Sequence, residues 1–152
     1  MCLIGNAGVG KTSIIHSFIN RKFTDKLPPT TGFETLDVIV KFKLHPAYPK
    51  SIERQVKLWI CDTAGEESES GLSRSYFRGA SAILVVCSYD DDISLENFTD
   101  LVHAANNHCS KDKLDKEYVR IYNVFNKTDL IPAEEDSDVL EQKYWNFPQD
   151  DF

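Results

Sequence analysis

One eight-residue motif near the start of the chain, Gly5 to Thr12, constrains the fold more than any other stretch. Its sequence GNAGVGKT matches G-x-x-x-x-G-K-[ST] at every fixed position, which is the pattern of a phosphate-binding loop. The apolar run 1–4 before it predicts the end of a buried strand, and residues 13–20 after it carry apolar side chains at helical spacing. The motif therefore lies between a strand and a helix, the context that phosphate binding requires.

This placement explains how such a loop would bind phosphate. Glycines let the backbone curl so that its N–H groups point at phosphate oxygens, and the N-terminus of the following helix adds partial positive charge. Lys11 is expected to reach the β- and γ-phosphates, and the Thr12 hydroxyl to bind Mg²⁺. The predicted nucleotide contacts here are Asn6, Ala7, Gly8, Val9, Gly10, Lys11, Thr12 and Ser13. The alternative is a glycine-rich turn that binds nothing.

Composition restricts the class of protein. With 152 residues, 41% hydrophobic and 27% charged, the chain is expected to form one soluble domain around a single core. A net charge of −7 argues against broad binding to a nucleic-acid backbone. The sequence shows no signal-peptide pattern and no apolar run near the ~20 residues of a membrane-spanning helix. The four cysteines form no C-x-x-C pair, which favours buried, reduced thiols in a cytosolic protein over a zinc site.

The hydrophobic pattern predicts several strands. The segment 36–44 alternates apolar and polar residues, which is typical of a half-buried, antiparallel or edge strand. A connection over 45–54 and a return strand over 56–62 should complete a hairpin with it. A continuous apolar run predicts a central parallel strand at 82–87, and 118–125 is a further strand candidate.

Helical patterns lie between these strands. Ser94 is expected to cap a helix whose apolar face consists of Leu95, Phe98, Leu101, Val102 and Ala105. Pro132 is expected to start an acidic helical stretch. Alternating strands and helices imply a parallel α/β sheet with right-handed crossovers, whose ligand site lies at the carboxyl ends of the strands. The phosphate loop, Asp62 and Asn126 each follow a strand end, so they should meet in space.

The second motif is Asp62-Thr63-Ala64-Gly65. An aspartate at a strand end can bind Mg²⁺, usually through water, and the N–H of a following glycine can sense the γ-phosphate. Alone, the motif is equally well explained as the end of a strand and a glycine turn.

The third motif, Asn126-Lys127-Thr128-Asp129, predicts recognition of a guanine base. The Asp129 carboxylate can accept hydrogen bonds from both N1–H and the exocyclic amine of guanine, and adenine offers no such pair of donors. The Lys127 stem can lie over the purine, and Asn126 can hold the loop together. Four polar residues are a weak signal alone, but their order after the two earlier motifs makes the signal strong.

Together these motifs resemble those of the small Ras-like GTPases over residues 1 to about 130. Ser75-Tyr76-Phe77-Arg78-Gly79-Ala80 and the strand after it resemble the Rab group most. The resemblance implies a P-loop NTPase fold: a mostly parallel central sheet with one antiparallel edge strand, and helices on both faces. It also implies that residues 1–152 are a single GTP-binding domain, incomplete at both termini and without the family's last strand and last helix.

The resemblance also implies roles for individual residues. Phe23 corresponds to an aromatic residue packed against guanine, and Thr30 to a switch threonine that binds Mg²⁺ and contacts the γ-phosphate. The implied metal site is Thr12, Thr30 and Asp62, and the implied catalytic residues are Lys11, Gly65 and Glu66. Glu66 stands where the family usually has glutamine, so unassisted GTP hydrolysis is expected to be slow. The 45–54 connection is longer than usual in the family, and residues 31–35 match its Rab switch signature only in part.

The implied function is a guanine-nucleotide switch in vesicle-mediated transport, with GTP or GDP and Mg²⁺ as cofactors. Its partners would be effectors that bind the two switch loops, an exchange factor and a GTPase-activating protein, and no nucleic acid. A cytoplasmic monomer is expected, reaching endomembranes only through a lipidated tail absent from this sequence. The rival hypothesis is a pseudo-GTPase scaffold without turnover, which Glu66 favours. A phosphate-loop kinase that uses ATP is disfavoured by N-K-x-D.

Overall fold

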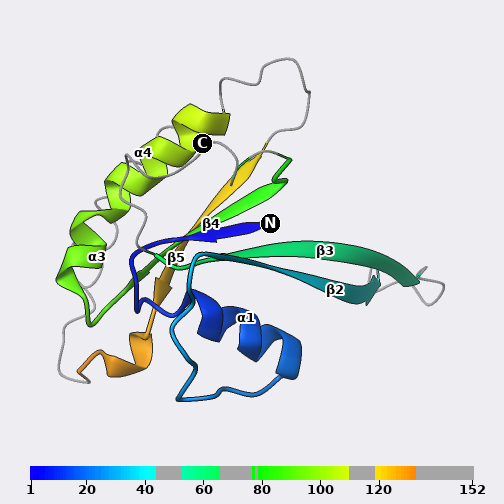
Figure 1. Cartoon of the computed structure of the whole chain (residues 1–152), viewed down its shortest axis with the longest axis horizontal. Helices are drawn as coiled ribbons and strands as arrows, with labels where there is room; N and C mark the ends of the chain where they lie inside the picture. Colours follow the sequence, from blue (N-terminus) through cyan, green and yellow to red (C-terminus); the bar gives the residue numbers. More distant parts are fainter. Residues whose placement is uncertain (44–52, 66–76, 78, 110–118, 133–152) are drawn as a thin grey trace.

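The computed structural model describes residues 1–43, 53–65, 77, 79–109 and 119–132. Within them the strands form one sheet in the order β2-β3-β1-β4-β5 (Figure 1). The elements of the chain are β1 (Cys2–Ile4), α1 (Lys11–Asn20), β2 (Phe33–Lys43), β3 (Glu53–Thr63), β4 (Ala82–Ser88), α3 (Asp92–Glu96), α4 (Phe98–Cys109), β5 (Arg120–Asn126) and the 3-10 helix η1 (Thr128–Leu130).

The sheet is parallel except at one edge. Strand β1 lies between β3 and β4 and is parallel to both, and β4 is in turn parallel to β5. Among the described strands, only β2 runs antiparallel, paired with β3. The expected mostly parallel sheet with one antiparallel edge strand is confirmed. Parallel pairing brings the carboxyl ends of β1, β3, β4 and β5 to the same side of the sheet.

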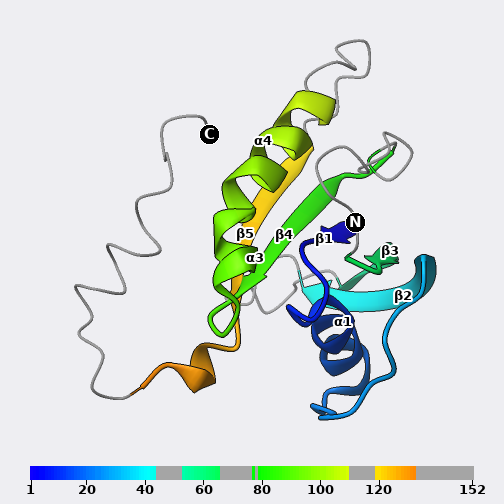
Figure 2. The same ribbon diagram turned by 60° about the vertical axis from the view of Figure 1, so that its left-hand side comes forward.

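Alternation along the short strand β1 divides the core into two clusters. Cys2 and Ile4 face α3 and α4, where they join a cluster that includes Phe98 and Leu101. Leu3 faces the other side and joins a cluster with Ile15 of α1. Figure 2 shows α1 and α4 on opposite faces of the sheet. The expected helices on both faces are therefore confirmed, and neighbouring side chains of β1 bury into different layers.

The β2–β3 hairpin is longer than its hydrophobic pattern predicts. Pairing runs from Phe33↔Thr63 to Lys43↔Glu53, so Arg54 lies inside β3, opposite Phe42, and not in the predicted connection. The polar ends extend the ladder because backbone hydrogen bonds between strands do not require burial. The rest of the predicted connection, 45–52, and Leu44 lie outside the described residues.

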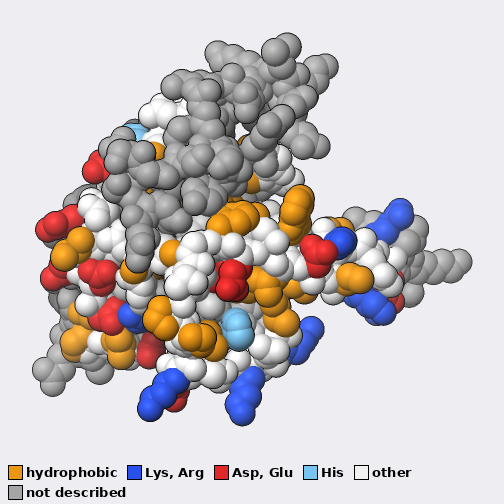
Figure 3. Space-filling model, in the orientation of Figure 1, with side chains coloured by type: hydrophobic (Ala, Val, Ile, Leu, Met, Phe, Trp, Pro, Cys, Tyr) orange, Lys and Arg blue, Asp and Glu red, His pale blue; other side chains and the backbone are white. Residues whose placement is uncertain are grey.

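The apolar face of the β2–β3 hairpin is packed against α1 only in the half that lies nearest the rest of the sheet. Leu36, Val38 and Leu58 pack against the α1 cluster, whereas Phe42 and Val56 farther along are each 41% exposed. The hairpin extends past the end of α1 in Figure 1 and projects from the body in Figure 3. The predicted apolar face is present, but its distal half meets no helix of the described chain.

The predicted helix after β4 differs in two ways. Its N-cap is Asp91, whose carboxylate accepts from the Ser94 backbone N–H at 3.2 Å, and Ser94 lies inside α3 and is buried. The structure also has two helices where one was predicted, because α3 ends at Glu96, Asn97 is its C-cap, and α4 begins at Phe98. The predicted apolar residues nevertheless all pack on the same core cluster. The helix predicted after Pro132 lies outside the described residues.

Among the described side chains, three cysteines take part in no disulfide bond: Cys2, Cys61 and Cys87. Burial raises the pKa of Cys87 to about 12 and raises that of Cys61 as well. Removal from water disfavours the thiolate, so both stay protonated at neutral pH. The side chain of the fourth, Cys109, lies outside the description.

Candidate functional site

The phosphate loop leaves β1 at the centre of the sheet and enters α1 at Lys11. Three of its glycines have positive φ: 147° at Gly5, 79° at Gly8 and 98° at Gly10. A Cβ on Gly5 would collide with the Val86 carbonyl oxygen of β4, and a Cβ on Gly10 with the Asn126 side-chain amide. The loop thus packs directly against β4 and the end of β5, and the predicted strand–loop–helix context is confirmed.

We predict that Gly10→Ala destabilises the fold more than Gly8→Ala does. Both alanines would adopt a left-handed backbone, at a cost of roughly 1–2 kcal/mol each. Nothing lies within 4 Å of a Cβ at position 8, whereas at position 10 the new methyl displaces the Asn126 amide. That amide donates to the Val9 carbonyl at 2.8 Å, and losing the bond should add about 1 kcal/mol. Thermal unfolding without nucleotide measures the difference, and equal midpoints would contradict the packing argument.

Lys11 is buried, with 4% of its surface exposed. Its ammonium turns back over its own loop and donates to the Gly5 carbonyl at 2.8 Å and the Asn6 carbonyl at 2.9 Å. Gly65, from the end of β3, lies against the same group. A Cβ there would collide with Lys11 Nζ and lie 2.6 Å from the Ala7 nitrogen. The first and second motifs are therefore in contact, although the outer side of the loop at Ala7 and Gly8 is exposed.

Three oxygen-bearing side chains meet beside the loop: Thr12, Thr30 and Asp62. The Thr12 hydroxyl lies 2.6 Å from Asp62 Oδ2 and 2.7 Å from the Thr30 hydroxyl. Because a hydroxyl has a single hydrogen, Thr12 donates to the carboxylate and accepts from Thr30. The residues come from α1, the segment before β2, and β3, so the fold brings together the predicted metal ligands. Their role as ligands stays a prediction.

A magnesium ion fits this cluster chemically. Asp62 is 1% exposed, and its Oδ1 is buried without a hydrogen-bond partner in the described structure. A buried, unpaired carboxylate oxygen costs free energy and calls for a bound water or ion. Carboxylate and hydroxyl oxygens are hard ligands, the kind that Mg²⁺ prefers. The donor set of Thr12, Thr30 and Asp62 is therefore compatible with Mg²⁺.

The third motif is joined to the first through Asn126. Its Nδ2 donates to the Val9 carbonyl at 2.8 Å, which ties the end of β5 to the phosphate loop. The backbone then turns at Lys127, with φ 58°, into η1, which contains Asp129. This bond reaches the first motif, and the expected role of Asn126 within its own loop stays a prediction. Asp129 itself is exposed.

Lys127 has a partner that the sequence analysis missed. Its ammonium lies 2.9 Å from Asp90 Oδ2, in the turn after β4. The hydrogen bond from Lys127 holds the pKa of Asp90 below its usual value. Asp90 follows the apolar run of β4, but no sequence motif links it to Lys127, so the pairing could not be predicted from the sequence.

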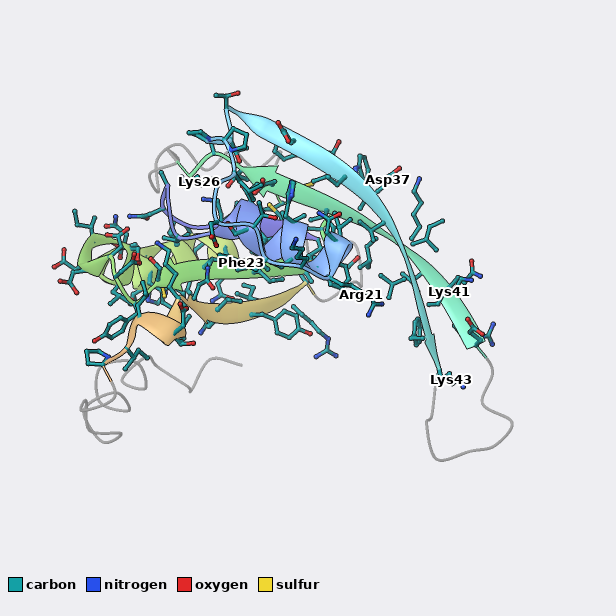
Figure 4. All side chains as sticks on the ribbon, turned by 90° about the horizontal axis from the view of Figure 1, so that it is seen from below. Arg21, Phe23, Lys26, Asp37, Lys41 and Lys43 are labelled. Atoms are coloured by element: carbon teal, nitrogen blue, oxygen red, sulfur yellow. The ribbon has the colours of Figure 1, made fainter. Side chains whose placement is uncertain are left out.

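For two predicted site residues, the described part of the structure shows no hydrogen bond or ion pair to the other motifs, and a third predicted residue lies outside that part. The Phe23 side chain is 65% exposed, on the segment after α1 (Figure 4). Ser13 lies in the first turn of α1 and is partly buried. Glu66 lies outside the described residues, as do most of those that follow it up to Arg78. The described site therefore comprises the phosphate loop, the Thr12–Thr30–Asp62 cluster and the end of β5.

The chain is similar to known proteins along most of its length. A family model described as the Ras family matches residues 1–146. Ras-related protein RABC1 of Arabidopsis thaliana is 37% identical over 128 residues, covering 78% of this chain and 56% of that protein. Human Ras-related protein Rab-4A is 40% identical over 84 residues, or 55% of this chain and 34% of that protein. Ras-related protein SEC4 of Candida albicans is 29% identical over 129 residues, which cover 85% of this chain and 54% of that protein. The chain spans about half, or less, of the length of these relatives.

Proposed function

Because the chain belongs to the Ras family and is similar to its Rab-type members, we propose that it is a guanine-nucleotide switch that binds GTP or GDP with Mg²⁺ and hydrolyses GTP. One observation carries the proposal. The phosphate loop, an oxygen cluster suited to Mg²⁺ and the guanine motif lie next to one another at the carboxyl ends of the strands. Each of these motifs alone also occurs in proteins that bind no nucleotide. Their contact with one another favours nucleotide binding over a purely structural role.

Each part of the site would hold a different part of the nucleotide. The backbone N–H groups of residues 6–10, the start of α1 and Lys11 would bind the phosphates. Lys11 donates to two backbone carbonyls, and it can exchange such bonds for bonds to phosphate oxygens. Thr12, Thr30 and Asp62 would hold Mg²⁺, which neutralises phosphate charge. Asn126, Lys127, Asp129 and Phe23 would surround the base.

The switch itself would involve two segments: the one that leads into β2 and the one that follows β3. Thr30 precedes β2 and Gly65 follows β3, and both reach the phosphate loop. The two segments are also joined directly, because the Ala64 backbone N–H donates to the Gly32 carbonyl at 2.9 Å. A γ-phosphate bound to Thr30 and to the Gly65 N–H would hold both segments, and hydrolysis would release both. We propose that effectors bind the surface formed by these two segments.

Equilibrium binding of nucleotides tests the proposal. The purified chain should bind GTP and GDP in the presence of Mg²⁺ and bind ATP far more weakly. Chelation of Mg²⁺ should speed nucleotide release. Equal affinity for ATP and GTP would contradict the assignment of the guanine motif, and Mg²⁺-independent release would contradict the assignment of the oxygen cluster.

Glu66 bears on whether turnover is fast or absent. Ionised glutamate can orient a water but cannot donate to the transferring phosphoryl group as glutamine can. Loss of one such donor costs roughly 10²–10³ in rate, and a glutamate protonated near phosphate recovers part of it. We therefore predict that Glu66→Gln speeds unassisted single-turnover GTP hydrolysis about tenfold. Equal rates would mean that this position is not limiting.

The same experiment addresses the rival hypothesis of a pseudo-GTPase. If the wild-type chain binds GTP but neither it nor Glu66→Gln releases phosphate, the scaffold hypothesis is the better one. If it turns over, we propose a cytoplasmic, monomeric switch in vesicle-mediated transport, controlled by an exchange factor and a GTPase-activating protein. Contact with endomembranes would depend on a lipidated tail. None of the helices in the described part of the chain is long and apolar enough to cross a membrane.

A further inference from the structure

We propose that Asp90 is a positioning residue of the nucleotide site, which holds Lys127 ready for the guanine nucleoside. The proposal rests on the function proposed above and adds a residue outside the three motifs. Lys127 Nζ and Asp90 Oδ2 are 2.9 Å apart, and the side chains are 31% and 39% exposed. Both side chains are thus partly covered, and the Lys127 ammonium is paired with the Asp90 carboxylate.

Asp90 lies in a turn fixed on both sides. Strands β4 and β5 are in register to Ser88↔Asn126, and the Tyr89 backbone N–H then donates to the Asn126 carbonyl at 3.1 Å. On the other side, the Asp91 N–H donates to the Ser88 carbonyl at 3.3 Å, and the Asp91 carboxylate caps α3. These bonds place the Asp90 carboxylate beside the guanine motif independently of any ligand.

Lys127 can contribute to binding a ligand only when its side chain is ordered. Its backbone is left-handed, with φ 58°, at the residue between Asn126 and η1. A free lysine side chain loses much conformational entropy when a ligand orders it. An ion pair that already orders the side chain removes part of this loss, which raises affinity through preorganisation. Asn126, bonded to Val9, fixes the backbone of the motif, and Asp90 fixes the lysine side chain.

A competing effect has the opposite sign. A carboxylate close to a bound polyphosphate repels it, so an Asp90 that acted by charge alone would weaken nucleotide binding. The chain offers a matched control for this effect, because three aspartates follow one another: Asp90, Asp91 and Asp92. Asp92 is exposed in the first turn of α3 and carries the same charge. Its replacement removes one negative charge nearby and leaves the Lys127 ion pair in place.

The test is a double-mutant cycle on GDP dissociation from the full chain with Mg²⁺. Asp90→Asn should raise the GDP dissociation constant about two- to fivefold, the effect of a partly exposed ion pair. Asp90→Glu should recover part of the loss, and Asp92→Asn should cause none. In a Lys127→Met background, Asp90→Asn should have no further effect, because its partner is already absent. Thermal unfolding without nucleotide shows whether each variant folds.

Three results would overturn the proposal. Wild-type affinity in Asp90→Asn would show that the ion pair does not contribute, and tighter binding would show that repulsion dominates. An equal loss in the Lys127→Met background would show that Asp90 acts independently of Lys127. These outcomes are distinct from failure of the proposed function, in which the wild-type chain itself would not bind GDP and both proposals would fall.

Discussion

Asp129→Asn is expected to weaken GTP binding by about 10²–10⁴-fold, since it disrupts two hydrogen bonds to a charged acceptor worth roughly 1.5–3 kcal/mol each. Asparagine keeps one acceptor oxygen but presents an N–H where the exocyclic amine of guanine also donates. Xanthine has a carbonyl at that position, so the variant should bind xanthosine triphosphate better than the wild type does. Competition between the two nucleotides for one labelled ligand measures the change in preference.

The structure makes Asp129→Asn an interpretable variant. Asp129 is exposed, so its replacement should leave the unfolding temperature nearly unchanged. Xanthosine triphosphate serves as the internal control, because better binding of it shows that the site remains assembled. An unchanged ratio of GTP to xanthosine triphosphate affinity would mean that Asp129 does not read the base.

Thr12→Ala is expected to weaken Mg²⁺-dependent nucleotide binding by roughly 10–100-fold, the range seen when groups that support a bound metal are removed. The Thr12 hydroxyl is the central member of its cluster, 2.6 Å from Asp62 and 2.7 Å from Thr30. Alanine leaves the buried Asp62 carboxylate with only the 3.4 Å contact to Thr30 among the bonds of this cluster. Nucleotide dissociation with and without Mg²⁺ measures the effect.

Two matched variants separate the chemistry from the packing. Thr12→Ser keeps the hydroxyl and loses only a methyl group, so it should retain most of the Mg²⁺ dependence. Thr30→Ala should spare GDP binding and impair only the triphosphate state, since Thr30 is the proposed contact of the γ-phosphate. If Thr12→Ser were as defective as Thr12→Ala, loss of the hydroxyl could not be the cause.

The sequence was sufficient to predict the sheet because hydrophobic patterns follow burial closely here. The continuous run 82–87 became β4, which is covered on both faces, and the alternating segment 36–44 became β2, where one face packs on α1. The prediction ended with the apolar pattern, which included Phe42 and Val56 although each is 41% exposed. Arg54 and Glu53 continue the hairpin through backbone pairing alone, which leaves no hydrophobic signal.

Local competition explains the incorrect helix cap. Asp91 and Ser94 are both good N-cap residues, and three residues separate a cap from the N–H that it accepts. Asp91 caps the N–H of Ser94, while the Ser94 hydroxyl is buried and donates to the Asp91 carbonyl at 2.7 Å. Ser94 also accepts from the Ser88 N–H at 3.1 Å. A contact with the preceding strand decided the outcome, and sequence spacing carries no information about it.

The candidate site also has a part that the sequence predicts and a part that it does not. Motif residues were identifiable because their chemistry needs particular side chains at fixed spacing, as with Lys11 and Thr12. The bonds that join the motifs have no such signature. Asn126 reaches Val9, and Ala64 reaches Gly32, across segments that are distant in sequence. Only the fold places these groups together, which is why Asp90 was also overlooked.

The central position of β1 has a consequence for how the chain folds. Cys2 pairs with both Cys61 and Ile83, so β1 precedes both of its partner strands in the chain by many residues. The β2–β3 hairpin is local and can form early, but β1 must wait for β3 and β4, and closing such long loops slows folding. The phosphate loop is the direct continuation of β1. Nucleotide is therefore expected to stabilise the finished domain by mass action without guiding the early steps of its assembly.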